Sequence, residues 1–260
     1  MQILYGFVLA IIVAYLAYRA HGLDKSGAVA AALVGTIIFG MGGWQWAILL
    51  LLFFITSSGL SRAFKKHKQG LNEKFSKGNE RDAGQVFGNG GLATLFAVLH
   101  TVYPESILPW IGFTAALAAV NADTWGTELG VLNSTSPRMI TDLKKRVEKG
   151  TSGGISSWGT CASLLGAAII ALPAALFANN WYLFPLVTCA GLAGSLFDSL
   201  LGATVQAMYY CPTDQKETEK HPLHTCGTET VLIRGWKWLN NDWVNFACGA
   251  FGVVIAFLFI

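Results

Sequence analysis

Eight long apolar segments divide this chain of 260 residues, and they constrain its fold more than any other feature. Each is a continuous apolar run that approaches the roughly 20 residues with which a helix crosses a bilayer. Their predicted limits are 3–18, 27–43, 45–60, 86–103, 107–122, 155–178, 183–205 and 243–260. A transmembrane β-barrel would instead show alternating apolar and polar residues. We therefore expect an all-α, polytopic transmembrane helix bundle, with residues 1–260 forming a single integral membrane domain.

The amino-acid composition excludes several other classes of protein. Hydrophobic residues make up 53% of the chain and charged residues only 13%, about half the charged share of a typical globular protein. The mean hydropathy is +0.48. A soluble protein of this size needs more charge to cover its surface. An ordinary soluble enzyme, a disordered chain and a nucleic-acid binder are therefore excluded.

Four polar loops contain every basic residue of the sequence. They are residues 19–26, 61–85, 123–154 and 206–242, and they carry 2, 7, 5 and 4 of the 18 lysines and arginines. Loops rich in Lys and Arg remain in the cytosol. We therefore expect cytosolic polar loops and both termini outside, in the inner membrane of a prokaryotic cell. No basic segment precedes the first span, so we expect no cleaved signal peptide.

Two features of the spans leave alternatives open. Spans 45–60 and 107–122 and the apolar part of 183–205 are short for a bilayer. Either these helices stop early to line a cavity, or the predicted limits are too narrow. Segments 26–35 and 157–166 are also similar, at an offset of 131 residues. This similarity fits either a weak parallel repeat of 1–130 and 131–260, or small residues on helix faces alone.

Acidic residues in and beside the spans indicate a metal site. Asp198 has apolar sequence on both sides, and a charge inside a span is costly and usually functional. Asp123 and Glu128 stand at the end of the fifth span, which runs in the same direction as the seventh. With Asn121, these residues offer the hard oxygen ligands that Mg²⁺ or Mn²⁺ prefers. The alternative is an acidic cluster at helix ends that faces water.

A glycine-rich segment at residues 150–154 indicates phosphate binding. It joins a basic loop to the start of the sixth span. Glycines let backbone N–H groups face an anion, and the following helix N-terminus adds its dipole. We expect Ser152, Gly153 and Gly154 to contact phosphate, with Lys144 and Lys145 nearby. The alternative is a flexible loop whose lysines lie at the membrane surface.

Three further elements have candidate roles. Arg81 and Asn89 flank the glycine-rich entry to the fourth span, where Asn89 either binds phosphate or caps the helix. The basic run at 65–68 is expected to be a stop-transfer signal or a contact with anionic lipid, rather than a catalytic patch. Zinc ligands of the usual types occur at Cys211, His221, His224 and Cys226, but at an irregular spacing, and ordinary thiols are the alternative.

Together, these stretches resemble an integral-membrane family that includes plant phytyl-phosphate kinase and its prokaryotic and animal relatives. The matching segments are 23–28, 81–89, 121–130, 137–138, 150–154, 198–202 and 240–245. The resemblance implies transfer of a phosphoryl group from CTP, or a similar nucleotide, to a prenyl monophosphate such as phytyl phosphate. Many relatives have a second cysteine soon after the position of Cys211. This chain has none there, which counts against zinc.

The residues and the resemblance together assign roles. The metal would be held by Asp123, Glu128 and Asp198, assisted by Asn121. Transition-state charge would be offset by Arg138, Lys144 or Lys145. Substrate would be bound by Arg81, Asn89, Asn121, Lys145, Ser152, Gly153, Gly154 and Ser199. The expected partners are a lipid prenyl phosphate, a nucleoside triphosphate and membrane lipids. Alternative functions are a prenol kinase, a cytidylyltransferase that forms a CDP-lipid, and a transporter coupled to ions at Asp123 and Asp198.

Overall fold

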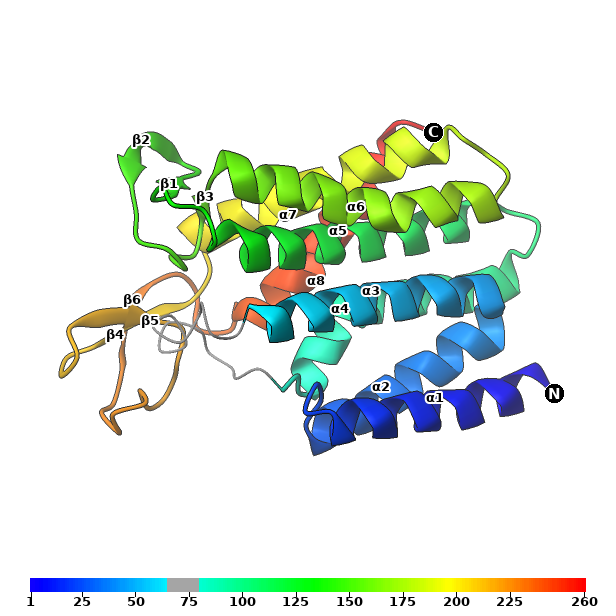
Figure 1. Cartoon of the computed structure of the whole chain (residues 1–260), viewed down its shortest axis with the longest axis horizontal. Coiled ribbons are helices and arrows are strands. Elements are labelled where there is room, and N and C mark those ends of the chain that lie inside the picture. The colour runs from blue at the N-terminus through cyan, green and yellow to red at the C-terminus, as the bar shows by residue number, and fades with distance from the viewer. Residues whose placement is uncertain (65–79) are drawn as a thin grey trace.

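The described part of the chain contains eight α-helices, and each coincides with a predicted span (Figure 1). The computed structural model describes residues 1–64 and 80–260. The helices are α1 (Gln2–Arg19), α2 (Lys25–Ile37), α3 (Trp44–Ala63), α4 (Ala83–Val102), α5 (Leu108–Gly130), α6 (Ser157–Phe177), α7 (Leu183–Thr204) and α8 (Asn241–Leu258). A short π-helix, η1 (Ile38–Gly42), continues α2. The predicted helix bundle is thereby confirmed.

Six helices in the described part of the chain are long and apolar enough to cross a membrane. The other two are α4 and α5, with 20 and 23 residues. Both carry polar side chains within the helix, such as Gln85 and Asn89 in α4 and Asp123 and Glu128 in α5. Polar groups at membrane depth are tolerated where they are enclosed by protein or line a cavity. The polarity of α4 and α5 therefore indicates where a site can lie.

The spans that looked short are full-length helices. α3, α5 and α7 contain 20, 23 and 22 residues. The predicted limits of α3 and α5 were therefore too narrow, which was one of the two alternatives, whereas α7 fills its predicted range of 183–205. The largest error is in α5, which was expected to end at 122 but continues to Gly130. Its last two turns carry the polar residues Asp123, Thr124, Thr127 and Glu128, which an apolar pattern does not include.

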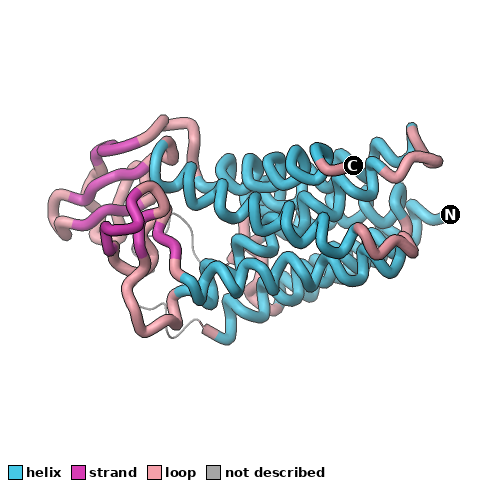
Figure 2. Tube along the Cα trace, turned by 90° about the horizontal axis from the view of Figure 1, so that it is seen from above, coloured by secondary structure: helices cyan, strands magenta, loops and turns pink. Residues whose placement is uncertain are grey.

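Two small antiparallel sheets, which the all-α expectation did not include, lie at one end of the bundle, opposite both termini (Figures 1 and 2). The first has the order β2-β1-β3, and the second has the order β5-β4-β6. Their strands are β1 (Arg138–Met139), β2 (Asp142–Arg146), β3 (Gly154–Ile155), β4 (Met208–Cys211), β5 (Lys216–Thr218) and β6 (Val231–Arg234).

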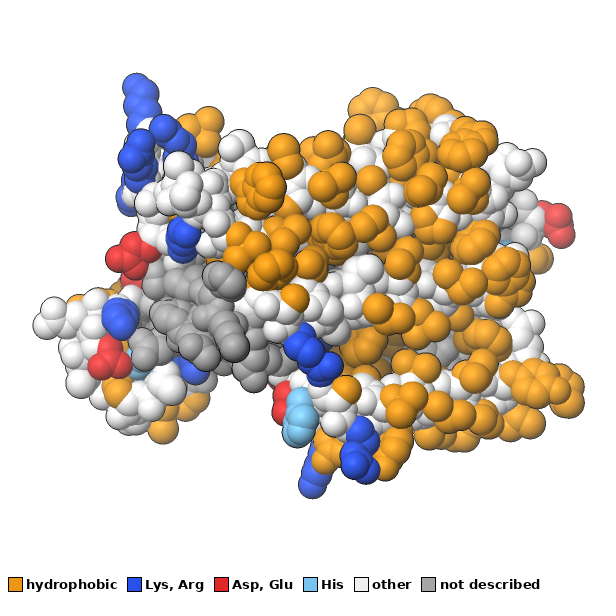
Figure 3. All heavy atoms as spheres, in the orientation of Figure 1, with side chains coloured by type: hydrophobic (Ala, Val, Ile, Leu, Met, Phe, Trp, Pro, Cys, Tyr) orange, Lys and Arg blue, Asp and Glu red, His pale blue; other side chains and the backbone are white. Residues whose placement is uncertain are grey.

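The surface of the bundle matches a protein embedded in lipid. Hydrophobic side chains cover the helices, while Lys and Arg gather toward the end that carries the sheets (Figure 3). On α1, for example, Ile3, Leu4 and Leu16 are 57–59% exposed. The described basic residues thus lie at one end, as the loop pattern predicted. The basic run at 65–68 lies outside the described residues.

Helix α5 forms the centre of the bundle. It is buried from Pro109 to Ala122 and again at Glu128, and it contacts α3, α4, α6, α7 and α8. Small residues allow this close packing. A Cβ added at Gly191 of α7 would lie 2.7 Å from Cβ of Ala167 and 3.0 Å from Cβ of Ala118. This packing encloses the polar end of α5 within protein.

Candidate functional site

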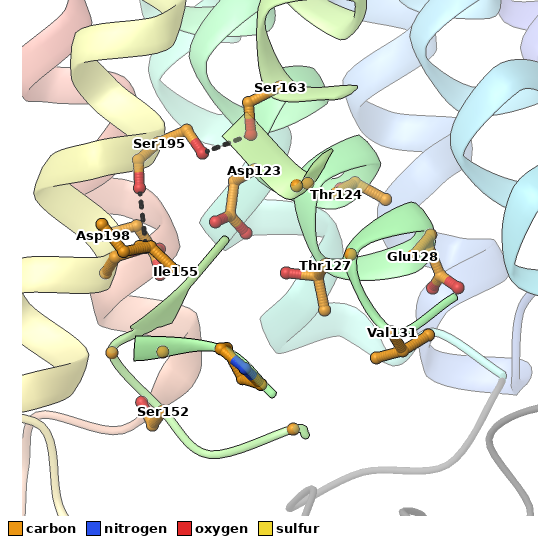
Figure 4. Close-up of a pocket in the computed structure, with 18 of the residues that line it drawn as sticks. Asp123, Thr124, Thr127, Glu128, Val131, Ser152, Ile155, Ser163, Ser195 and Asp198 are labelled. Carbon is orange, nitrogen blue, oxygen red and sulfur yellow. Dashed lines mark hydrogen bonds between the residues drawn. The ribbon is translucent and has the colours of Figure 1, made fainter. Parts of the chain in front are cut away.

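A polar cavity of about 290 Å³ lies where the helix bundle meets the sheets (Figure 4). The ends of α3 to α8 and the loops between them surround it. Its lining includes Ser61, Arg81, Gln85, Asn89, Asp123, Glu128, residues 149–156, Ser195, Asp198, Ser199, Gln206, Glu219, Asn241 and Asn245. The cavity thus brings together candidate residues that are far apart in the sequence.

Three helices begin at this cavity. Asp82, Ser156 and Asn240 are the N-caps of α4, α6 and α8, and each side chain accepts a hydrogen bond from a backbone amide of its helix. Residues of the first turns, including Gln85, Gly159 and Asn241, line the cavity. The N-terminus of a helix carries a partial positive charge and favours anions. The cavity is therefore suited to phosphate groups.

Two carboxylates from neighbouring helices face this space. Asp123 lies near the end of α5 and Asp198 near the end of α7 (Figure 4). The carboxylates of Asp123 and Glu219 both repel the charge of Asp198. In addition, Oδ2 of Asp198 is buried and has no hydrogen-bond partner among the described residues. Carboxylate oxygens are ligands that Mg²⁺ prefers. A bound cation would offset the repulsion between these carboxylates and would give the buried oxygen of Asp198 a partner.

The structure places Glu128 apart from this pair. It follows Asp123 by five positions, a rotation of roughly 140° around the helix, and Figure 4 shows it directed away from Asp123. Oγ of Ser61 donates a hydrogen bond of 2.7 Å to Oε1 of Glu128, and Glu128 attracts Arg81. All three expected acids thus line one cavity, but Glu128 is directed toward Ser61 and Arg81 rather than toward the other two. The third acid near Asp198 is Glu219, which follows β5 and which the sequence analysis missed.

Unlike the three acids, Asn121 is not among the residues that line the cavity. Its side chain is fully buried. Its Nδ2 donates to the carbonyl of Gly166 at 2.7 Å, and its Oδ1 accepts from Oγ of Ser57 at 3.0 Å. These bonds connect α5 to α3 and α6. The expected contribution of Asn121 to metal or substrate binding does not match this placement, because its amide is engaged within the bundle.

The glycine-rich segment lines the cavity and is packed firmly. Gly153 has a φ of +85°, and a Cβ there would lie 2.5 Å from Cβ of Ala203 on α7. Oγ of Ser152 donates to Oε1 of Gln206 at 2.9 Å. The amide of Gly154 donates to the carbonyl of Thr151 at 3.0 Å, which closes a turn. The segment is thus packed against α7 and held by hydrogen bonds, an arrangement that suits a phosphate-binding loop.

The expected basic residues do not reach the cavity. Arg138 lies on β1, Lys144 and Lys145 lie on β2, and all three are exposed. A guanidinium nitrogen of Arg138 donates to the carbonyl of Leu143 within the same hairpin. The strands carry these side chains away from the site, which the linear sequence did not indicate. Lys149 lines the cavity instead, and its Nζ donates to the carbonyl of Val131 at 3.0 Å.

Arg81 is held at the edge of the cavity by three elements. Its guanidinium lies 5.6 Å from the ring centroid of Phe53 and 5.9 Å from that of Phe54. Its backbone pairs with Gly22 and Asp24. A Cβ at Gly27 would lie only 2.0 Å from the carbonyl oxygen of Arg81. The segment 23–28, which had no assigned role, therefore positions Arg81.

A second, apolar cavity of about 260 Å³ begins beside Arg81. Residues of α1, α2, α3 and α4 enclose it, including Ala10, Ala31, Val34, Ala47 and Phe53. Arg81, Gln85 and Asn89 line both cavities. Along α3 the lining extends from Trp44 to Phe54, roughly 15 Å at 1.5 Å per residue. A polar space and an apolar space therefore meet at one arginine.

Several serine and asparagine residues complete the polar cavity. Ser199 is among the lining residues, as expected, and its Oγ donates to the carbonyl of Ser195 at 3.3 Å. The hydroxyls of Ser163 and Ser195 are 3.1 Å apart. Asn241 and Asn245 were overlooked as site residues, although segment 240–245 was among the matching stretches. The three asparagines of that segment, at the start of an apolar span, were the available signal.

Comparisons with known proteins agree with the resemblance found in the sequence. The sequence pattern of the family described as "Integral membrane protein DUF92" matches residues 8–253. Protein PGR of Arabidopsis thaliana is 33% identical over 94% of this chain and 91% of its own length. Uncharacterized membrane protein MJ0933 of Methanocaldococcus jannaschii is 36% identical over 76% of this chain and 82% of its own length. Protein VTE6, chloroplastic, of A. thaliana is 27% identical over 91% of this chain and 65% of its own length. No solved structure matches the chain.

Proposed function

The chain belongs to the DUF92 family of integral membrane proteins, and we propose that it transfers a phosphoryl group from a nucleoside triphosphate to a prenyl monophosphate. The product would be the prenyl diphosphate. The resemblance to the family that includes plant phytyl-phosphate kinase makes phytyl phosphate the first acceptor to test and CTP the first donor. The positive-inside pattern supports a reaction at the cytosolic face.

One observation carries this proposal. A cavity with four acidic residues and three helix N-termini shares Arg81, Gln85 and Asn89 with an apolar cavity. The polar part suits phosphates and a divalent cation. The apolar part suits a hydrocarbon chain. A prenyl phosphate combines these two kinds of surface in one molecule, with its phosphate at the junction.

The donor nucleotide fits the side of the cavity formed by α6 and α7. Its phosphates would lie against Ser152, Gly153 and the N-terminus of α6, with Lys149 supplying positive charge. Asp123 and Asp198, with Glu219 close to Asp198, would hold Mg²⁺ or Mn²⁺. The ion would neutralise charge on the transferring phosphates. In this arrangement Lys149, which lines the cavity, takes the role that was expected for Lys144, Lys145 or Arg138.

The acceptor fits the side formed by Arg81 and α4. Burial lowers the pKa of Arg81, and the carboxylate of Glu128 opposes that change. A guanidinium keeps its charge in proteins, so Arg81 can bind the acceptor phosphate. Gln85 and Asn89 adjoin the same point. The prenyl chain would extend into the apolar cavity, between α1, α2, α3 and α4. Ser61 and Glu128 would position Arg81 rather than react.

The chemistry of the acceptor explains why this site can act without a dedicated base. A phosphate monoester has a second pKa of about 6 and is therefore largely dianionic at neutral pH. It can attack directly, whereas an alcohol must lose a proton. Rate enhancement then depends mainly on in-line placement and on stabilisation of charge. A packed loop at residues 150–154 and a firmly held Arg81 provide such placement.

A prenol kinase is the second candidate, because the carboxylate of Glu128 lies close enough to Arg81 to attract it and is a potential base for an alcohol. Purified protein incubated with Mg²⁺, CTP or ATP, and matched prenols and prenyl phosphates separates the two. We expect a prenyl diphosphate from the phosphate substrate and no product from the prenol. Product from the prenol alone would support the second candidate. No product from either, together with nucleotide-independent ion flux in proteoliposomes, would favour a transporter.

A further inference from the structure

A cluster of four potential metal ligands lies at the outer end of the second sheet, outside the cavity described above. It comprises Cys211, Asp214, His224 and Cys226, and one ligand atom from each lies within 4.8 Å of all the others. We propose that these four residues bind a structural Zn²⁺ ion. The proposal is independent of the proposed enzymatic function.

The distances between the ligand atoms support this assignment. Sγ of Cys211 and Sγ of Cys226 are 3.5 Å apart, and Nδ1 of His224 lies 3.4 Å from Sγ of Cys226. Nδ1 of His224 also lies 2.8 Å from Oδ2 of Asp214. For Zn–S bonds of about 2.3 Å and Zn–N or Zn–O bonds of about 2.0 Å, the corners of a tetrahedron lie roughly 3.3–3.8 Å apart. Small outward shifts of these side chains would therefore accommodate the ion.

The local backbone brings the ligands together in two short turns. Cys211 ends β4 and Asp214 follows in the turn to β5, where the amide of Asp214 donates to Sγ of Cys211 at 3.5 Å. His224 and Cys226 lie in a second turn, in which the amide of Gly227 donates to the carbonyl of His224 at 2.9 Å. Cys211 and His224 are buried. Each turn thus presents one buried and one outer ligand to the same point.

This set differs from the one that the spacing suggested. His221 stacks on Tyr209, with ring centroids 4.4 Å apart, and is not part of the cluster. Asp214, three positions after Cys211, supplies a fourth ligand group instead. A carboxylate is an established zinc ligand. The absence of that cysteine therefore does not remove the site.

The position of the sheet explains what the ion would do. Oε1 of Glu219, which follows β5, accepts a hydrogen bond of 2.9 Å from Nε2 of Gln206, and both residues line the polar cavity. On the opposite edge, Arg234 of β6 donates to the carbonyl of Gly202 on α7. The sheet contains only 11 residues in strands, and such short strands need additional support. Zinc would supply it and keep Glu219 in place.

Metal analysis of the purified full-length protein tests the proposal. Protein prepared without chelators is expected to contain about one zinc per chain. Cys226→Ser and His224→Ala should each reduce zinc to less than a tenth of the wild-type content. Cys189→Ser, a matched change at an exposed cysteine of α7, should retain it.

A second measurement does not depend on the folding of the variants. Wild-type protein stripped of metal and titrated with Co²⁺ should develop the absorption of thiolate-bound, tetrahedral cobalt, and added Zn²⁺ should remove that absorption. Folded wild-type protein that binds neither ion would overturn the proposal. So would zinc that persists in both ligand variants, or a disulfide between Cys211 and Cys226 in the protein as isolated.

Discussion

Asp198→Asn provides the sharpest test of the cation site, because it should change stability and activity in opposite directions. Asp198 has one buried oxygen without a hydrogen-bond partner among the described residues, and the carboxylates of Asp123 and Glu219 repel it. Two unit charges on the order of 6 Å apart repel by about 3 kcal/mol at an effective dielectric constant near 20. Asparagine keeps the shape and removes the charge. In metal-free buffer, the variant should therefore be about 1–3 kcal/mol more stable than wild type.

Magnesium should reverse this order. A ligand at 100 times its Kd stabilises the folded state by about 2.7 kcal/mol, and each kcal/mol shifts Tm by about 2–4 °C in a chain of this size. Wild-type Tm should therefore rise by roughly 5–11 °C with Mg²⁺, whereas Asp198→Asn should hardly respond. Turnover of the variant should fall by at least about 100-fold. Loss of a residue that only hydrogen-bonds a metal ligand already costs up to about 100-fold in activity, and loss of the ligand itself should cost at least as much.

Thermal unfolding in detergent, followed by tryptophan fluorescence with Mg²⁺ or with chelator, measures these shifts. Asp142→Asn is the matched control, because Asp142 is exposed on β2 and lies outside the cavity. It should retain the wild-type response. A folded Asp198→Asn protein with both the wild-type Mg²⁺ shift and wild-type turnover would refute the cation site.

Three other experiments test separate parts of the account. Asn121→Ala should lower the free energy of unfolding by about 2–4 kcal/mol, because it leaves the buried partners of two hydrogen bonds unpaired. Turnover per folded molecule should change less than about threefold. A large loss of turnover in stable protein would show that Asn121 takes part in the site. Ala47→Phe, in the apolar cavity, should raise KM at least about tenfold for long prenyl phosphates but not for short ones. Ile55→Phe, at an exposed position of the same helix, should leave KM unchanged, and equal effects of both changes would contradict the placement of the chain. In intact cells, an impermeant thiol reagent should label Glu105→Cys but reach Lys145→Cys only after permeabilisation; the opposite result would reverse the orientation.

The helices and the paired acids could be predicted because both follow from the cost of burying polar groups. Continuous apolar runs identified all eight helices, and Asp198 stood out as a charge within such a run. The end of α5 was missed for a related reason. Its last two turns are polar on the side that faces the cavity, so the apolar run stops before the helix does. An apolar pattern alone cannot distinguish a helix that continues into a polar cavity from one that has ended.

The rest of the site depends on tertiary contacts that the linear sequence does not contain. Glu128 seemed a metal ligand because it is near Asp123 in the sequence, but helix geometry turns it toward Ser61 and Arg81. Glu219 lies near Asp198 only because the second sheet folds back against α7. Lys144 and Lys145 are close to the glycine-rich loop in sequence, yet their strand is exposed. The helical period of 3.6 residues per turn by itself places Glu128 and Asp123 on different faces of α5.

The most direct test of the central claim is the fate of isotopic label from the nucleotide. Purified protein should be incubated with Mg²⁺, a prenyl monophosphate, and CTP labelled either at the γ-phosphate or at the α-phosphate, with Asp123→Asn and Asp142→Asn in parallel. We predict that γ-label appears in a prenyl diphosphate, that α-label remains in CDP, and that only Asp123→Asn abolishes the transfer. Label from the α-phosphate in the lipid, with release of pyrophosphate, would instead show a cytidylyltransferase and contradict the account.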